Sequence, residues 1–142
     1  MDIFISKCEE DTLQVAENFA KTLKGGTVVA FLGGLGMGKT AFVRGALKGL
    51  NNSARVSSPT FALVNDYGGT PQVYHFDMYR ITDEDDLYST GYFDYLTDDA
   101  VLFIEWSENI SQWLPDNTVF VKIELTETEN CRKISIFTGE EK

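Results

Sequence analysis

The sequence predicts one three-layer α/β domain with a mixed β-sheet, on three observations. Two short apolar runs, residues 27–32 and 100–104, are typical of buried strands. Strand-like and helix-like segments are interspersed along the chain, which favours helices packed on both faces of a sheet. Residues 118–125 and 133–137 alternate like an antiparallel hairpin. The chain, residues 1–142, has the size of a single domain and can bury about two-thirds of its unfolded surface.

Four elements are predicted before residue 51, and each has a local signal. They are a strand over residues 2–6, a helix over 9–23, a strand over 27–32 and a helix from 39 to about 50. The first helix carries apolar residues at helical spacing, among them Leu13, Ala16 and Phe19, and a Gly-Gly pair follows it. The run TVVAFL (27–32) is short, apolar and β-branched, so a buried strand is predicted there.

A second set of elements is predicted in the rest of the chain. They are strands over residues 61–66 and 72–81, a short acidic helix over 83–88, a strand over 100–104, and strands over 118–125 and 133–137. The turn sequence GGTP, residues 68–71, joins the first two of these strands. The last two strands alternate apolar and polar residues, as an antiparallel pair does.

The charge is negative and unevenly distributed. The chain holds 22 acids and 12 bases, yet residues 81–120 contain ten acids and no Lys, Arg or His. Such a segment repels a phosphate backbone and favours a basic protein partner. We therefore predict that acids within 83–86 and 94–99 form a docking surface for protein rather than for RNA. The alternative is an ordinary solvated acidic face.

Targeting and cysteine signals are weak. No apolar run approaches the ~20 residues of a membrane span, and the N-terminus has no basic segment of the kind that begins a signal peptide. The two cysteines, Cys8 and Cys131, form neither a disulfide framework nor a zinc motif. We expect a reduced, cytoplasmic protein with no membrane association.

The strongest motif lies between the strand at 27–32 and the helix at 39–50. Its residues are Gly33, Gly34, Leu35, Gly36, Met37, Gly38, Lys39 and Thr40, which fit G-x-x-x-x-G-K-[ST]. Glycines let backbone N–H groups surround phosphate oxygens, and the helix N-terminus adds a partial positive charge. Lys39 supplies a cation to the β- and γ-phosphates, and the Thr40 hydroxyl is placed to bind Mg²⁺. A chance glycine-rich turn is the alternative, which the flanking strand and helix disfavour.

A nucleoside triphosphate site of this kind also needs a carboxylate at the end of a neighbouring strand. Glu105 directly follows the apolar run 100–104, and Asp77 lies near the end of the strand that begins at residue 72. We predict that Glu105 holds magnesium, while Asp77 on this pattern is as consistent with a surface acid as with a site residue. Thr60, in the sequence SSPTF, is placed either to sense the γ-phosphate or to form an ordinary turn. The single histidine, His75, is interpreted as a packed or hydrogen-bonded residue rather than a base.

Several segments together resemble one family. They are GGLGMGKT (33–40), SSPTFALVNDY (57–67), VYHFDMYRI (73–81), GYFDYL (91–96) and IEWSENISQWLP (104–115). Their order and spacing are similar to those of the TsaE (YjeE) family, over about residues 9–132. Met37 departs from the family, in which a small residue is common at that position.

The resemblance implies a P-loop NTPase-like fold and an ATPase required for threonylcarbamoyl modification of adenosine 37 in tRNA. It implies that residues 35–40 wrap the phosphates of ATP and that Thr40 and Glu105 hold Mg²⁺. Asp77 and Thr60 would be switch or water-positioning residues, and adenine would lie between Glu9 and Arg132. The implied partners are the proteins TsaB and TsaD, with tRNA reached only through them.

Two other functions stay open on the residues themselves. The first is a nucleotide or small-molecule kinase, and the second is an ATP sensor that switches a partner without hydrolysis. A kinase needs several cations to clamp two phosphorylated substrates, but the chain has only four arginines and no arginine-rich lid. ATP hydrolysis coupled to partner proteins is therefore the leading hypothesis.

Overall fold

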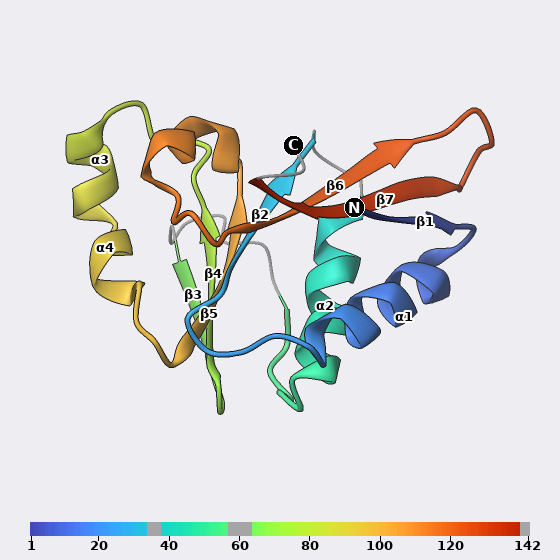
Figure 1. Cartoon of the computed structure of the whole chain (residues 1–142), viewed down its shortest axis with the longest axis horizontal. Coiled ribbons are helices and arrows are strands. Elements are labelled where there is room, and N and C mark those ends of the chain that lie inside the picture. The colour runs from blue at the N-terminus through green and yellow to red at the C-terminus, as the bar shows by residue number, and fades with distance from the viewer. Residues whose placement is uncertain (34–37, 57–63, 140–142) are drawn as a thin grey trace.

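The computed structural model describes residues 1–33, 38–56 and 64–139, and its described strands form one seven-stranded sheet (Figure 1). The strand order is β1-β7-β6-β2-β5-β4-β3. The strands are β1 (Asp2–Ser6), β2 (Val28–Leu32), β3 (Val64–Gly68), β4 (Gln72–Asp77), β5 (Ala100–Glu105), β6 (Val119–Leu125) and β7 (Arg132–Thr138).

The sheet is mixed, as predicted. β2 pairs in parallel with both β5 and β6, and β4 pairs in parallel with β5. The outer pairs β1–β7, β6–β7 and β3–β4 are antiparallel. Because β2, β4 and β5 run in one direction, their carboxyl ends meet at one edge of the sheet, which is the edge that carries the site.

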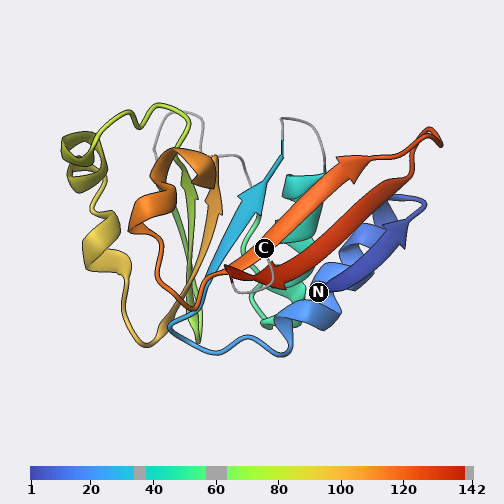
Figure 2. The same ribbon diagram turned by 45° about the horizontal axis from the view of Figure 1, so that its top comes forward.

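Two helices cover one face of the sheet (Figures 1 and 2). They are α1 (Glu9–Ala20) and α2 (Lys39–Gly49). The core under them is apolar and includes an edge-to-face contact between the rings of Phe31 and Phe42, 5.6 Å apart. α1 packs closely on α2 because Gly45 has no side chain, and a Cβ there would lie 2.4 Å from the carbonyl oxygen of Leu13. The glycine thus sets the spacing of the two helices.

Short helices cover the opposite face. They are α3 (Glu84–Ser89), α4 (Tyr92–Tyr95) and the 3₁₀ segment η1 (Ser107–Trp113). A second apolar core lies beneath them and includes Phe76, Leu102 and Ile104 from the strands. The predicted three-layer α/β architecture is therefore confirmed. Within the described ranges, no helix is long and apolar enough to cross a membrane.

Two predicted element ends were wrong. The first helix ends at Ala20 rather than residue 23, because the Thr22 hydroxyl and backbone N–H both bond to the Phe19 carbonyl and turn the chain. The strand predicted over 72–81 ends at Asp77, and the chain turns where the Ile81 N–H bonds to the Met78 carbonyl. α4 and η1 were not predicted. Of the strand predicted over 61–66, residues 61–63 lie outside the described residues.

Candidate functional site

The site lies between the end of β2 and the start of α2. Gly38 is the N-cap of α2 and has φ +99°, a conformation that favours glycine. Among the described residues, a Cβ at Gly38 would meet only a methyl group of Ile123, at 4.0 Å, so the backbone angle is the reason found there for a glycine. The helix therefore starts with its N-terminal N–H groups at the carboxyl edge of the sheet.

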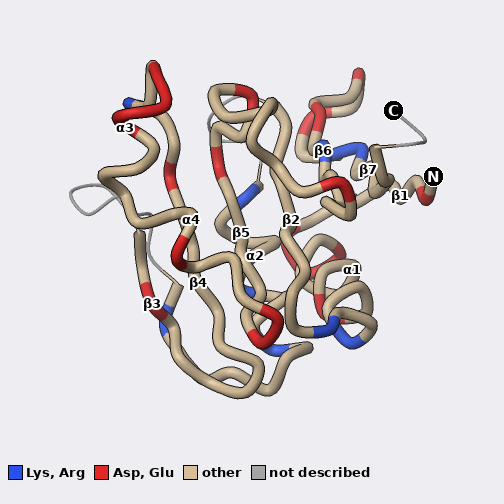
Figure 3. The backbone as a smooth tube through the Cα atoms, turned by 60° about the vertical axis from the view of Figure 1, so that its left-hand side comes forward, with Lys and Arg blue, Asp and Glu red and all other residues tan. Residues whose placement is uncertain are grey.

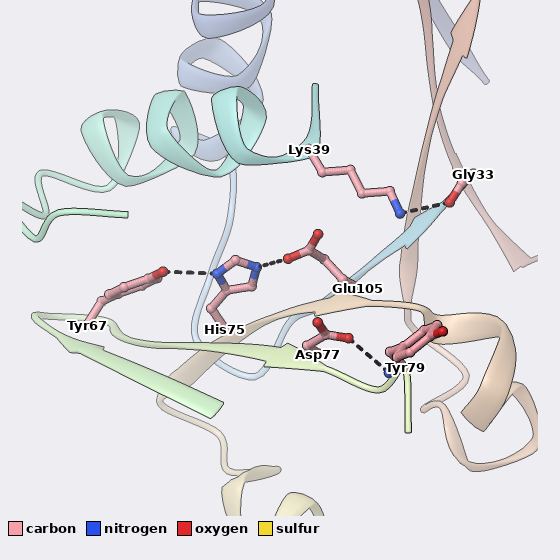
Figure 4. Close-up of polar contacts among 7 residues, drawn as sticks. All are labelled: Gly33, Lys39, Tyr67, His75, Asp77, Tyr79 and Glu105. Carbon is pink, nitrogen blue, oxygen red and sulfur yellow. Dashed lines mark hydrogen bonds and ion pairs between the residues drawn. The ribbon is translucent and has the colours of Figure 1, made fainter. Parts of the chain in front are cut away.

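Lys39 is the first residue of α2 and is buried, with 4% of its surface exposed. Its Nζ donates a hydrogen bond to the Gly33 carbonyl at 2.8 Å (Figure 4). The same ammonium lies 5.6 Å from the centre of the Trp106 ring, within the range of a cation–π contact. The fold thus holds a cation between the end of β2 and the residue that follows β5.

Two carboxylates face each other across the neighbouring strands. Asp77 ends β4, Glu105 ends β5, and the two residues are paired in register. The Asp77 carboxylate accepts a hydrogen bond from the Tyr79 N–H at 2.9 Å. Burial raises the pKa of Asp77, and the Glu105 carboxylate raises it further, while the Tyr79 hydrogen bond and the Lys39 ammonium lower it. The structure therefore brings Lys39, Asp77 and Glu105, all predicted site residues, to one place.

His75 lies behind Glu105 and is fully buried. Its Nε2 is 2.7 Å from Glu105 Oε2, and its Nδ1 is 3.0 Å from the Tyr67 hydroxyl (Figure 4). The prediction that His75 is a hydrogen-bonded residue is confirmed. Its partner, the predicted magnesium carboxylate Glu105, was not predicted from the sequence. The available signal was the two-residue spacing of His75 and Asp77, which places both on one face of a strand.

Residues after β5 pack against this edge, and the hydrogen bonds of Ser107 and Asn109 there were not predicted. Trp106 has φ +59°, and its ring lies 5.0 Å from that of Tyr79. The Asn109 amide donates to the Met78 carbonyl at 2.9 Å, and the buried Ser107 hydroxyl donates to the Phe31 carbonyl at 2.8 Å. These contacts connect the segments that follow β4 and β5 to each other and to β2.

A pocket of about 580 Å³ opens beside the start of α2. Gly38, Thr40, Glu9 and Arg132 are among the residues that line it. Glu9 also forms an ion pair with Arg44, at 2.6 Å, and Arg44 lines the same pocket. Thr40, Glu9 and Arg132, which lie far apart in the sequence, are thus brought together as predicted site residues.

The remaining predicted residues, Gly34, Leu35, Gly36, Met37 and Thr60, lie outside the described residues. In the described part of the chain no group of three or more His, Cys, Asp and Glu side chains is arranged to hold a metal. One or two carboxylates and a threonine hydroxyl nevertheless suit Mg²⁺, which protein sites bind through few side chains together with phosphates and water. The donor set therefore fits a magnesium ion that arrives with a nucleotide, not a protein-only metal centre.

The strand–glycine–lysine–helix junction, with acids on the adjacent strands, defines an α/β protein of the P-loop NTPase-like class. The crystal structure of Bacillus subtilis YdiB has a similar fold, with a TM-score of 0.74 and 27% sequence identity. The similarity covers 99% of this chain and 87% of that chain.

The sequence profile described as "Threonylcarbamoyl adenosine biosynthesis protein TsaE" matches residues 6–134. The chain therefore belongs to the TsaE family. It is 33% identical over 132 residues to the tRNA threonylcarbamoyladenosine biosynthesis protein TsaE of Treponema pallidum, covering 93% of this chain and 97% of that protein. It is 37% identical over 138 residues to the protein of the same name from Aquifex aeolicus, covering 94% and 93%. The family role is in the biosynthesis of threonylcarbamoyladenosine in tRNA.

Proposed function

We propose that the protein binds ATP with Mg²⁺ and hydrolyses it in support of threonylcarbamoyl modification of adenosine 37 in tRNA. One observation carries the proposal. A buried lysine at a helix start lies at the same sheet edge as two carboxylates that are paired in register, beside a pocket of about 580 Å³. Triphosphate hydrolysis needs this combination, because the cation and the metal offset phosphate charge while a carboxylate orients the attacking water.

Each residue has a proposed role. Lys39 contacts the β- and γ-phosphates, and the backbone N–H groups of residues 35–40 would surround them. Thr40 and Glu105 hold Mg²⁺, which when bound neutralises charge on the phosphates. Asp77 orients water, and Thr60 would act with it as a switch or water-positioning residue. The weakened acidity of Asp77 suits this role, because a raised pKa makes its carboxylate a better proton acceptor.

The pocket beside α2 would take the nucleoside end of ATP. Glu9 and Arg132 both line it, and the Glu9–Arg44 ion pair connects α1 to α2. A base held there would lie next to Thr40, so its triphosphate would extend along the start of α2. The pocket thus leads directly from the nucleoside position to the phosphate position.

We propose that the protein works with TsaB and TsaD in the cytoplasm and reaches tRNA only through them. The acidic stretch carries this part of the proposal. Acidic positions gather at α3, near the sheet edge that holds the site (Figure 3). This acidic surface, defined by Asp83, Glu84, Asp85 and Asp86, would attract a basic protein surface and repel RNA phosphates.

Phosphate release from ATP with Mg²⁺ and no added acceptor tests the proposal. The ATPase is expected to release phosphate, and to release more when TsaB and TsaD are present. A kinase would consume ATP only when an acceptor is supplied, and it would transfer the phosphoryl group to that acceptor. A sensor would bind ATP in calorimetry without turnover under any of these conditions. Either of the last two results would overturn the hydrolytic function.

A further inference from the structure

We infer that His75 and Tyr67 are positioning residues that orient the Glu105 carboxylate toward the magnesium position. The inference rests on the proposed function, because it assigns a task to residues that act through Glu105. His75 is fully buried, so it cannot itself touch a nucleotide. Its direct contact with the described site residues is the 2.7 Å hydrogen bond from its ring to Glu105 Oε2.

The geometry requires a proton on the His75 nitrogen that faces Glu105. A carboxylate can only accept hydrogen bonds, so the Nε2 atom that faces Glu105 must be the donor. In a neutral imidazole the other nitrogen is then an acceptor, and the Tyr67 hydroxyl lies 3.0 Å from it. In that tautomer the Tyr67 hydroxyl is placed to donate to Nδ1, and such a bond favours the form of His75 that donates to Glu105.

The hydrogen-bonded series from Tyr67 through His75 restricts the orientation of the Glu105 carboxylate. Glutamate has three rotatable side-chain bonds, so a carboxylate at a strand end adopts several positions unless something holds it. His75 holds one oxygen, and the other oxygen points away from the imidazole ring (Figure 4). Histidine–carboxylate pairs behind metal ligands commonly fix ligand orientation in this way, and their loss costs about 10- to 100-fold in metal affinity or activity.

The surroundings argue against simple packing as the reason for these polar groups. β4 and β5 place Val73 and Phe103 beside His75 on the same face, within an apolar core. An apolar side chain at position 75 would pack there without needing partners, whereas a buried polar chain costs desolvation unless it is fully bonded. The polar chain runs without a break from Tyr67 on β3 to the acid at the sheet edge.

Two substitutions at His75 separate positioning from structure. In His75→Gln the amide nitrogen reaches the place of Nε2 and still donates to Glu105. In His75→Asn it reaches only the place of Nδ1, so the bond to Glu105 is lost. We expect His75→Asn to lower kcat about 10- to 100-fold and to raise by a similar factor the Mg²⁺ concentration needed for tight binding of a non-hydrolysable ATP analogue. His75→Gln should recover most of both losses.

Binding of the analogue without Mg²⁺ should stay unchanged in both variants, because His75 does not touch the nucleotide. Tyr67→Phe should raise the Mg²⁺ requirement, whereas Tyr74→Phe, on the neighbouring strand, should not. The positioning role would be overturned if His75→Gln and His75→Asn had the same kcat and the same dependence of analogue binding on Mg²⁺. It would also be overturned if His75→Asn left the Mg²⁺ concentration needed for tight binding unchanged. If the wild-type protein bound the ATP analogue with the same affinity with and without Mg²⁺, the proposed function would instead be contradicted.

The wild-type protein offers a second measurement that needs neither nucleotide nor a folded variant. His75 is the single histidine of the chain, so a ¹H–¹⁵N spectrum of its imidazole has one set of signals. We expect Nε2 to carry a proton, because the Glu105 carboxylate that faces it can only accept a hydrogen bond. An unprotonated Nε2 would overturn the hydrogen bond on which the positioning role rests.

Discussion

Asp77 and Glu105 lie directly opposite each other as the last residues of two neighbouring parallel strands. Two acids so placed repel each other, and the raised pKa of Asp77, which is due first to its burial, reflects this repulsion as well. The arrangement is costly for the protein alone. It becomes favourable when a cation lies between the acids and a triphosphate, which is the situation that the proposed function requires.

The two acids should therefore differ in what their loss does. In Glu105→Gln the shape is kept and the charge removed, so turnover should fall sharply and Mg²⁺ should no longer strengthen nucleotide binding. In Asp77→Asn hydrolysis should slow while Mg²⁺-dependent binding is retained, because Asp77 is proposed to orient water. Calorimetric titration of an ATP analogue with and without Mg²⁺, together with phosphate release, measures both. If the two variants show the opposite pattern, their roles are exchanged.

The acidic surface at α3 should mediate docking of a basic partner. The variant to make carries Asp83→Asn, Asp85→Asn and Asp86→Asn together. Its helix should persist, because Asp83 caps α3 by accepting from the Asp86 N–H, and asparagine caps a helix nearly as well. Association with the TsaB–TsaD pair should weaken, and the wild-type association should weaken with added salt. ATP binding should be unchanged.

A control with the same change in charge is available elsewhere on the chain. The exposed acids Glu10, Glu127 and Glu129 lie outside α3, and their joint change to glutamine should leave docking intact. Normal docking by the α3 variant would refute the proposed surface. So would tight binding of tRNA by the isolated wild-type protein at physiological salt.

Tyr92 should make the fold sensitive to alkali. Burial raises the pKa of its hydroxyl to about 12, and the hydroxyl donates to the Trp113 carbonyl at 3.0 Å. A tyrosine in the unfolded chain ionises near pH 10, so between about pH 10 and 12 the folded state binds more protons than the unfolded state. The free energy of unfolding should therefore fall by roughly 1 kcal/mol per pH unit over that window because of this group.

Urea unfolding of wild type and Tyr92→Phe, near neutral pH and at about pH 11, measures this effect. Near neutral pH the variant should be less stable by about 1 kcal/mol, because the Trp113 carbonyl loses its donor. At the higher pH the difference should shrink or reverse. A difference that stays constant with pH would show that Tyr92 ionises alike in both states.

Gly45 should be intolerant of any side chain. In Gly45→Ala the new methyl would meet the Leu13 carbonyl oxygen, so α1 must move away from α2. Alanine raises intrinsic helix propensity by about 1 kcal/mol relative to glycine, but overpacking of a close contact costs typically 1–3 kcal/mol. A lower melting temperature is expected, with Ala41→Gly as a helix-propensity comparison in α2. A higher melting temperature for Gly45→Ala would contradict the close packing described here.

The elements with strong local signals were predictable from sequence. β2 and β5 are short apolar runs, α2 follows a glycine loop, and β6 and β7 alternate in polarity. α4 and η1 were not predictable in this way because tertiary contacts form them. The Tyr92 hydroxyl bonds to Trp113, and the Ser107 hydroxyl bonds to Phe31, which lies 76 residues away.

The site residues also differ in whether a local sequence pattern predicts them. Lys39 follows from its motif, and Glu105 follows from an apolar strand that ends in an acid. The His75–Glu105 hydrogen bond depends on the register of two strands 30 residues apart, which no local pattern specifies. Glu9 and Arg132 were predicted through family resemblance alone, and the fold brings them to one pocket.

The most direct test of the nucleotide site is the affinity of Lys39→Ala for ATP, measured by calorimetry in the presence of Mg²⁺. Lys39 is the buried cation of the site, and loss of its charge-assisted contact to phosphate should cost about 1.5–3 kcal/mol, or roughly a tenfold to hundredfold rise in Kd. The exposed Lys48→Ala, at the other end of α2, serves as the control and should bind ATP as the wild type does. An affinity of Lys39→Ala equal to that of the wild type, in a folded protein, would contradict the assignment of this helix start as the phosphate site.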